Sequence, residues 1–280
     1  EYEKVDFEPG GRDHSTNGGS FDTGKEIIHS IWESKAPSYV AYEWISAKGG
    51  AEFSSSAGVV TLPKEVLEIY EPDVMIYLFT GTQPNKPFSI SFDLDVLKVY
   101  EDFDKVERIY SEKEKEKMKR VYELSCKKIP SKMGDQPTFR HLTTLLQIYE
   151  GDIKKATEGI VSSRVNERAK CALNWLEKYA PEDFKFSVHK EITDEINEHL
   201  TDKQKSSLKD LRESLNKKTF KDKELFEEFY SIFEKNGIKN KEFFEGAYLA
   251  IIGKKRGPKL ANFILALGQK RISELLNGVK

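Results

Sequence analysis

Residues 7–20 have the sequence FEPGGRDHSTNGGS. The run follows a stretch of alternating apolar residues and leads into a helical pattern. Gly10 and Gly11 lack side chains, so the backbone there can turn tightly and approach a ligand. The carboxylate of Asp13 can accept hydrogen bonds from ribose hydroxyls or from an ammonium group, and His14 can line the adjoining pocket. These residues predict a ligand-holding turn formed by Gly11, Asp13 and His14.

The same run has a second interpretation. Glycine, aspartate and asparagine also dominate ordinary turns, where they bind nothing. In such a turn Asp13 would accept hydrogen bonds from its own loop backbone. The spacing of the residues alone leaves both interpretations open.

The elements around this run predict a strand–helix–strand unit. We expect a strand that ends at Val5–Phe7 and is closed by Pro9, Gly10 and Gly11. A helix capped by Ser20 or Asp22 should follow, with an apolar stripe at Ile27, Ile28 and Ile31 and an end before Pro37. A second strand over 39–45 and a loop over 48–60 complete the unit. This order is typical of the second half of a doubly wound α/β domain, in which ligands bind beyond the carboxyl ends of the strands.

From Pro63 onward, apolar residues recur at the spacing of a helix. Pro63 is typical of a first helical turn, and Gly237, Gly253 and Gly268 separate the last helices. The expected helices include 93–110, 138–149, 152–176, 194–200, 202–215 and 222–233, several with Asp or Thr at their starts, as caps require. The fold class is therefore mainly α with a small α/β part. We predict three domains, 1–62, 63–135 and 136–280, with the second boundary beside residues 133–137.

The composition is that of a folded globular protein. Of 280 residues, 38% are hydrophobic and 33% are charged, with a net charge of −2, which excludes a disordered chain. No apolar run approaches the roughly 20 residues that span a bilayer. Cys126 and Cys171 fit a reducing compartment, and neither has the neighbour spacing of a metal ligand. We expect a cytoplasmic monomer that contacts no membrane and binds no metal through this segment.

A second candidate site is the loop from Gly49 to Gly58. Ser54, Ser55 and Ser56 offer hydroxyl and backbone donors to an anion. The loop lacks the Gly-Lys-Ser/Thr ending of the ATPase phosphate loop. The alternative is a flexible serine-rich loop that binds nothing.

A third candidate is the basic connection at residues 253–259. It carries Lys254, Lys255, Arg256 and Lys259, which suit contacts with a phosphate backbone. The alternative is a solvated turn whose lysines lie near a helix C-terminus. The aromatic residues Phe226, Phe229, Tyr230 and Phe233 fall at helical spacing, which favours a core role over a stacking platform.

Several segments together resemble class I lysyl-tRNA synthetase, most strongly from residue 5 to about 110. They are VDFEPGGRDH at 5–14, GGSFDTG at 18–24, YEWI at 42–45, FSSSAG at 53–58, PNKP at 84–87, FDLD at 92–95 and the basic segment 253–260. The resemblance implies that residues 1–62 end a Rossmann-like catalytic domain and carry its KMSKS-like loop. Residues 63–135 would form a helical connecting domain that contacts the tRNA stem, and residues 136–280 an α-helical anticodon-binding domain.

The resemblance also implies an activity and roles for residues. Members of this family activate lysine with ATP and Mg²⁺ and transfer it to tRNA(Lys). Asp13 would contact the adenylate or the polar end of the amino acid, and His14 would line the pocket for the lysine side chain. The serines at 54–56 would close over the ATP phosphates, with Gly11 and Gly58 in the ATP-binding loops. The four cations at 254–259 would contact tRNA.

Two departures from the family pattern limit these expectations. The first class I signature, HIGH, is absent from the sequence, and none of its histidines lies in that pattern. In the second signature, Glu52 and Phe53 replace Lys-Met, Ser55 stands at the second lysine position, and Ala57 replaces another expected lysine. We therefore expect a carboxyl-terminal fragment that does not activate lysine alone. The alternative is a non-catalytic tRNA-binding module derived from a class I synthetase.

Overall fold

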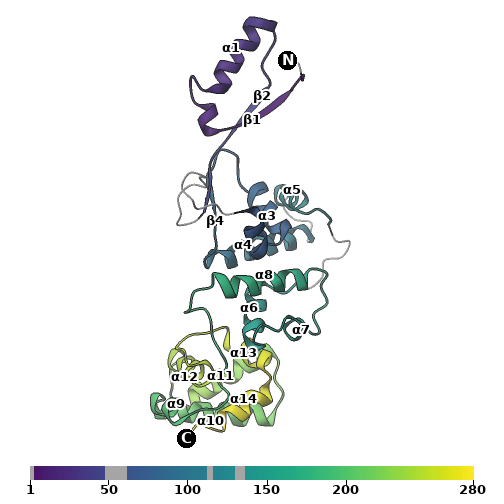
Figure 1. Ribbon diagram of the computed structural model, residues 1–280. Helices are drawn as coiled ribbons and strands as arrows, with labels where there is room; N and C mark the ends of the chain where they lie inside the picture. Colours follow the sequence, from purple (N-terminus) through teal and green to yellow (C-terminus); the bar gives the residue numbers. More distant parts are fainter. Residues whose placement is uncertain (1–2, 48–61, 112–115, 130–135) are drawn as a thin grey trace. The chain divides into compact units, whose positions relative to one another are not determined.

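The computed structural model describes residues 3–47, 62–111, 116–129 and 136–280. The chain divides into two compact units, residues 1–134 and 135–280. The first unit contains the strands that the structure describes together with several helices, and the described elements of the second unit are helices joined by loops (Figure 1). The finer division into three domains stays a prediction.

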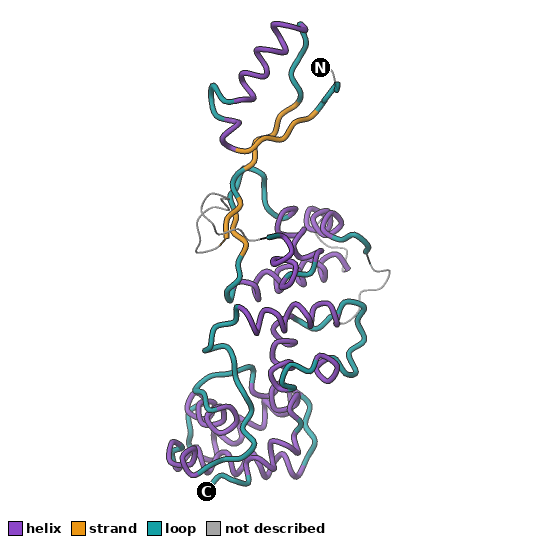
Figure 2. The backbone as a smooth tube through the Cα atoms, in the orientation of Figure 1, coloured by secondary structure: helices purple, strands orange, loops and turns teal. Residues whose placement is uncertain are grey.

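The first unit begins with a parallel strand–helix–strand motif, as expected. Strand β1 (Phe7–Gly11) is followed by a short 3-10 turn, η1 (Arg12–Ser15), then by helix α1 (Ser20–Trp32) and strand β2 (Ser38–Tyr42). The two strands pair in parallel, from Phe7 opposite Ser38 to Gly11 opposite Tyr42. In the tube of Figure 2 they appear as adjacent orange segments with α1 beside them. This motif is the small α/β part of the fold.

The predicted end of the first strand is wrong. Pro9, Gly10 and Gly11 lie inside β1 instead of closing it. The reason is a partner that lies far away in the sequence: Tyr39 of β2 occupies the space that a side chain at Gly10 would need, and a Cβ there would overlap its hydroxyl. Tyr39 is itself stacked on Phe21, with ring centroids 3.7 Å apart. Gly10 is therefore a packing residue of the strand and not a turn residue.

Two further local expectations are corrected. Helix α1 has Gly19 as its N-cap, without a side-chain cap; Asp22 acts from the first turn by accepting a 3.1 Å hydrogen bond from the Gly18 N–H. The strand expected over 39–45 is interrupted after Tyr42. Strand β3 (Ile45–Ala47) belongs instead to a second parallel pair with β4 (Phe88–Ile90).

Four helices complete the described part of the first unit. They are α2 (Pro63–Ile69), α3 (Pro72–Thr80), α4 (Asp95–Ser111) and α5 (Glu116–Ser125). Pro63 occupies the first turn of α2, as predicted. The buried tyrosines of this unit have hydrogen-bond partners: Tyr100 donates to the Ile69 carbonyl at 3.0 Å, and Tyr122 donates to Glu107 at 2.7 Å. Burial and the Glu107 carboxylate raise the pKa of Tyr122, so its phenol remains a donor.

The second unit consists of helices. They are α6 (Phe139–Ile148), α7 (Ile153–Ala156), α8 (Val165–Lys178), α9 (Asp194–His199), α10 (Asp202–Lys217), α11 (Asp222–Asn236), α12 (Asn240–Ile252), α13 (Leu260–Leu267) and α14 (Gln269–Leu276). The single helix expected over 152–176 is wrong, because α7 and α8 are separate elements and Gly159 between them has a φ of +76°. The expected ends at Gly237, Gly253 and Gly268 are confirmed, each with a positive φ.

The core of the second unit is formed mainly by the last five helices. Its centre includes Phe229, Phe243, Ile251 and Ile264, each at most 1% exposed. Trp175 of α8 is fully buried and meets the ring of Phe184 edge-on. Among the helices that the structure describes, none combines the length and apolarity needed to cross a membrane.

Candidate functional site

The first candidate site is the turn that follows β1. Ser15 holds it in place: its hydroxyl donates to the Gly11 carbonyl at 2.8 Å and lies 2.8 Å from the Tyr39 hydroxyl. Arg12 adds an ion pair with Glu43, with 3.3 Å between the charged atoms. These contacts connect η1 to both strands, so Asp13 and His14 are presented from a fixed turn at the carboxyl end of β1.

The two candidate side chains on this turn are both exposed. His14 Nδ1 lies 2.8 Å from the Ser20 hydroxyl at the start of α1, which orients the ring and leaves Nε2 for a ligand. Within the described ranges, the Asp13 carboxylate has no hydrogen bond or ion pair. The carbonyl of Asp13, and not its carboxylate, is the loop acceptor, bonded by the Thr16 hydroxyl at 3.0 Å. Within the described residues, the contact expected of an ordinary turn, from the loop backbone to the Asp13 carboxylate, is therefore absent.

Gly19 shapes the same turn. A Cβ at this position would lie 2.8 Å from both the His14 and the Thr16 carbonyl oxygens. A glycine is needed there because the backbone of the turn folds back on itself. Ser54, Ser55, Ser56 and Gly58, the predicted phosphate-binding residues, lie outside the described residues.

We expect His14→Ala to raise the KM for lysine more than the KM for ATP when it is introduced into a complete class I ligase. The reason is the role that the family resemblance implies, in which His14 lines the pocket for the lysine side chain. Steady-state ATP–pyrophosphate exchange with each substrate varied in turn measures both constants. Equal increases in the two constants would contradict the assignment.

The second described candidate site is the basic connection between α12 and α13. Lys254 donates to the backbone carbonyls of Glu182 and Asp183, at 2.7 and 3.3 Å. The Lys255 ammonium lies 3.5 Å from the Glu245 carboxylate. Two of the four predicted RNA-binding cations are therefore engaged inside the chain.

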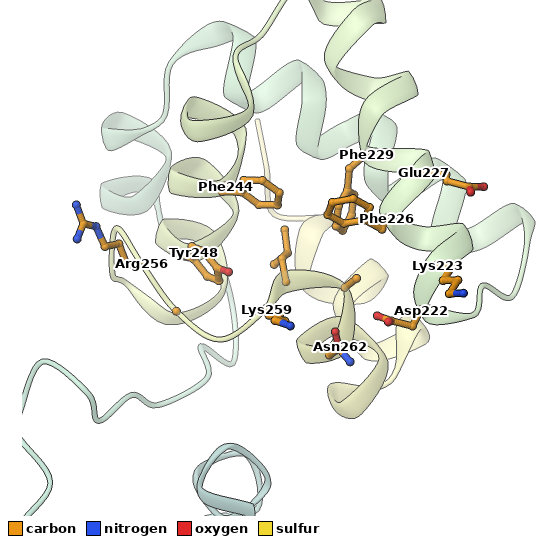
Figure 3. Close-up of a pocket in the computed structure, with 13 residues that line it drawn as sticks. Asp222, Lys223, Phe226, Glu227, Phe229, Phe244, Tyr248, Arg256, Lys259 and Asn262 are labelled. Atoms are coloured by element: carbon orange, nitrogen blue, oxygen red, sulfur yellow. The ribbon is translucent and has the colours of Figure 1, made fainter. Parts of the chain in front are cut away.

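The other two cations of this connection are exposed at the edge of a cavity. Neither Arg256 nor Lys259 has a hydrogen bond or ion pair with any residue that the structure describes. The cavity measures about 780 Å³ and is drawn in Figure 3. Its lining comes from α11, α12, the connection and the start of α13: Asp222, Lys223, Phe226, Glu227, Phe229, Phe244, Tyr248, Arg256, Gly257, Lys259, Leu260, Ala261 and Asn262.

A hydrogen bond from Tyr248 joins the connection to helix α12 beside this cavity. Its hydroxyl donates to the Pro258 carbonyl, and burial raises the pKa of Tyr248 to about 12, so the phenol keeps its proton at neutral pH. Gly257 lies directly against the ring, since a Cβ there would come within 2.8 Å of it. The backbone N–H of His189 donates to the carbonyl of Ile251, near the end of α12, at 2.8 Å.

Sequence reasoning placed four cations on one connection but missed these supporting residues. Tyr248 lies in a helical stripe, where it is indistinguishable from a core residue, and His189 is distant in the sequence. The expected core role of the aromatic residues on α11 holds for Phe229 and Phe233 but not for Phe226 and Tyr230, which are 48% and 46% exposed. Among the described residues, no group of three His, Cys, Asp or Glu side chains is arranged to bind a metal ion.

Comparisons with known proteins agree with this architecture. Residues 1–128 match the family described as tRNA synthetases class I (K), and residues 141–277 match an anticodon binding domain. The lysine–tRNA ligase of Borreliella burgdorferi is 42% identical over 98% of this chain and 55% of its own length. That of Thermococcus kodakarensis is 36% identical over 98% of this chain and 56% of its own length.

One solved structure covers almost the whole chain at low similarity. It is a glutamate tRNA ligase from Elizabethkingia meningosepticum, 12% identical, with a TM-score of 0.46 over 99% of this chain and 58% of that one. The chain spans about half the length of the curated relatives that it matches. Over most of its length the chain is thus similar to part of a lysine–tRNA ligase: residues 1–128 match the class I (K) tRNA synthetase model and residues 141–277 match the anticodon binding domain model.

Proposed function

We propose that this chain contributes part of the adenylate site and the tRNA-binding region of a class I lysine–tRNA ligase. The enzyme would activate lysine with ATP, which enters with Mg²⁺, and would transfer the lysine to tRNA(Lys). The observation that carries the proposal is the pair of exposed cations, Arg256 and Lys259, beside an aromatic cavity. The cavity lies within the segment that matches an anticodon binding domain.

The proposed chemistry requires positioning and charge stabilisation, and no protein nucleophile. The lysine carboxylate attacks the α-phosphate of ATP and pyrophosphate leaves; a terminal ribose hydroxyl of the tRNA then displaces AMP. Asp13 suits this site because a carboxylate accepts hydrogen bonds from an ammonium group or from ribose hydroxyls. His14, oriented by Ser20, suits the wall of the amino-acid pocket.

We expect the 280-residue chain to bind a tRNA(Lys) transcript with an affinity that falls as salt is raised. Each phosphate neutralised by a lysine or arginine releases counterions, so the logarithm of the binding constant should fall linearly with the logarithm of the salt concentration. Fluorescence anisotropy between roughly 50 and 200 mM salt measures this slope. An absence of binding, or binding independent of salt, would contradict the proposal.

A non-catalytic tRNA-binding module is the second candidate function. It is favoured by the replacement of signature lysines, with Glu52, Ser55 and Ala57 in the second signature. Both functions predict tRNA binding, and only the first predicts that Asp13 and His14 affect lysine activation. We also propose that the chain is a monomer that acts in the cytoplasm; light scattering during size-exclusion chromatography tests the monomer.

A further inference from the structure

A second cavity lies between helix α1 and the segment that leads from it into β2. It measures about 480 Å³ and is open to solvent. Its lining includes Phe21, Lys25 and His29 from α1, and Ser34 and Lys35 from the following segment. Among the described residues that line it, none is acidic. Lysines without a carboxylate among them suit an anion, and lysine is a common partner of phosphate.

One end of this cavity adjoins the η1 turn of the proposed adenylate site. Tyr39, which lines the cavity, has its hydroxyl 2.8 Å from the hydroxyl of Ser15 in that turn. The Tyr39 ring stacks on that of Phe21, with centroids 3.7 Å apart. Phe21 directly follows Ser20, whose hydroxyl lies 2.8 Å from His14 Nδ1. Two separate contacts therefore connect this end of the cavity to the turn.

From the η1 turn the cavity follows α1 toward the end of the helix. Phe21, Lys25 and His29 are spaced four residues apart, so they lie along one face of the helix. At a rise of about 1.5 Å per residue, the first and last of them are separated by about 12 Å along the axis. Along one strand of a duplex each nucleotide rises about 3.4 Å. The cavity is therefore long enough to follow more than one phosphate of an RNA strand.

The charged and polar side chains of the cavity are available to a ligand. Lys25, His29 and Lys35 are all exposed. Neither His29 nor Lys35 has a side-chain hydrogen bond or ion pair with any residue that the structure describes. The Lys25 ammonium lies 5.5 Å from the centroid of the Phe21 ring and 3.7 Å from the carboxylate of Asp22. An exposed ion pair of this kind contributes little, so a phosphate can take the place of the carboxylate.

We propose that this cavity binds backbone phosphates at the 3′ end of the RNA, an inference that rests on the proposed lysine–tRNA ligase function. The terminal ribose must reach the η1 turn to accept lysine, so the phosphates behind it pass over the neighbouring surface of the first unit. Lys25 and Lys35 contact the phosphate oxygens, and a ring N–H of His29 donates to one of them. These contacts position the RNA and read no base.

The test measures binding of the full 280-residue chain to a fluorescently labelled minihelix with the acceptor arm of tRNA(Lys). The double variant Lys25→Ala with Lys35→Ala is expected to weaken binding roughly tenfold or more, since it removes charge-assisted contacts. The salt slope should fall by about 1 to 2, because each phosphate contact to a single strand accounts for about 0.7. Lys25→Arg with Lys35→Arg preserves both charges and should retain the slope.

The matched control is Lys154→Ala with Lys270→Ala. It removes the same charge from exposed positions that do not line this cavity. The control is expected to leave the affinity and the salt slope close to those of the wild type. Circular dichroism confirms that each variant is folded.

Neutral methylphosphonate linkages in the minihelix locate the phosphates. At one or two linkages near the 3′ end, the neutral linkage should weaken binding to the wild-type chain. Combined with Lys25→Ala and Lys35→Ala, it should cost little more than the protein change alone, because both changes remove the same contact. At linkages outside the cavity the two costs should add.

Two kinds of failure are distinguishable. If the wild-type chain binds the minihelix but the Lys25/Lys35 variant binds like the control, or its cost adds to that of every neutral linkage, the cavity does not hold these phosphates and the proposed function stands. The same conclusion follows if the chain binds full tRNA(Lys) but not the minihelix. If the wild-type chain binds neither RNA, the proposed function itself fails.

Discussion

Lysine-dependent ATP–pyrophosphate exchange is expected to stay at background for the isolated 280-residue chain. The described residues supply one wall of the proposed adenylate site, the η1 turn with Asp13 and His14. The HIGH signature, which would supply another, is absent from this sequence. By the family resemblance, Glu52 replaces a signature lysine whose charge-assisted contact with phosphate would be worth about 1–3 kcal/mol. A carboxylate there would repel the triphosphate instead.

The measurement compares this chain with the full-length lysine–tRNA ligase of Borreliella burgdorferi, a curated relative, at equal concentration, with and without tRNA. Incorporation of labelled pyrophosphate into ATP is followed with and without lysine. Exchange that requires lysine and approaches the rate of the full-length relative would refute the prediction. It would show that the 280 residues of this chain form a complete site for lysine activation.

Phe243→Ala is expected to destabilise the second unit by about 3–5 kcal/mol, the usual range for removing a buried phenylalanine. Phe243 is 1% exposed. Its ring centroid lies 5.0 Å from that of Phe233 and 5.5 Å from that of Phe229. Replacing the Phe243 ring with a methyl group would leave a cavity among the neighbouring rings. This cavity could close only if α11 and α12 moved.

Hydrogen–deuterium exchange of the full chain in increasing urea measures this change, because peptides from α11 and α12 report the opening of the second unit separately from the first. Phe243→Leu should cost less, since it preserves most of the buried apolar volume. Tyr230→Ala is the exposed control on α11, at 46% exposure, and should cost under about 1 kcal/mol, as surface changes usually do. A similar small cost for Phe243→Ala would place that ring outside the core.

Local signals in the sequence predicted the helices of the second unit well. Thr138, Thr193 and Thr201 cap α6, α9 and α10 with their side chains, because a threonine hydroxyl satisfies a backbone N–H that the first turn leaves unpaired. The glycines at 237 and 253 end α11 and α12 in the left-handed conformation. Caps depend on residues a few positions apart, so the sequence alone contains the needed information.

Two other expectations went wrong because distant residues decided the outcome. Pro9–Gly11 has turn-forming residues but lies in a strand, because Tyr39 of β2 fills the space above Gly10. Four cations at 254–259 look equivalent in the sequence, yet the carbonyls of Glu182 and Asp183 engage Lys254 from about 70 residues away. Sequence reasoning could therefore locate the basic connection but could not tell its structural cations from its exposed ones.

The parallel pairing of β3 with β4 has a consequence for the order of folding. Ile45 lies opposite Phe88, and helices α2 and α3 are encoded between the two strands. Closing so long a segment costs chain entropy before any strand contact forms, whereas each helix forms from residues close in sequence. We therefore expect β3 and β4 to pair late in the folding of the first unit, after α2 and α3 have formed.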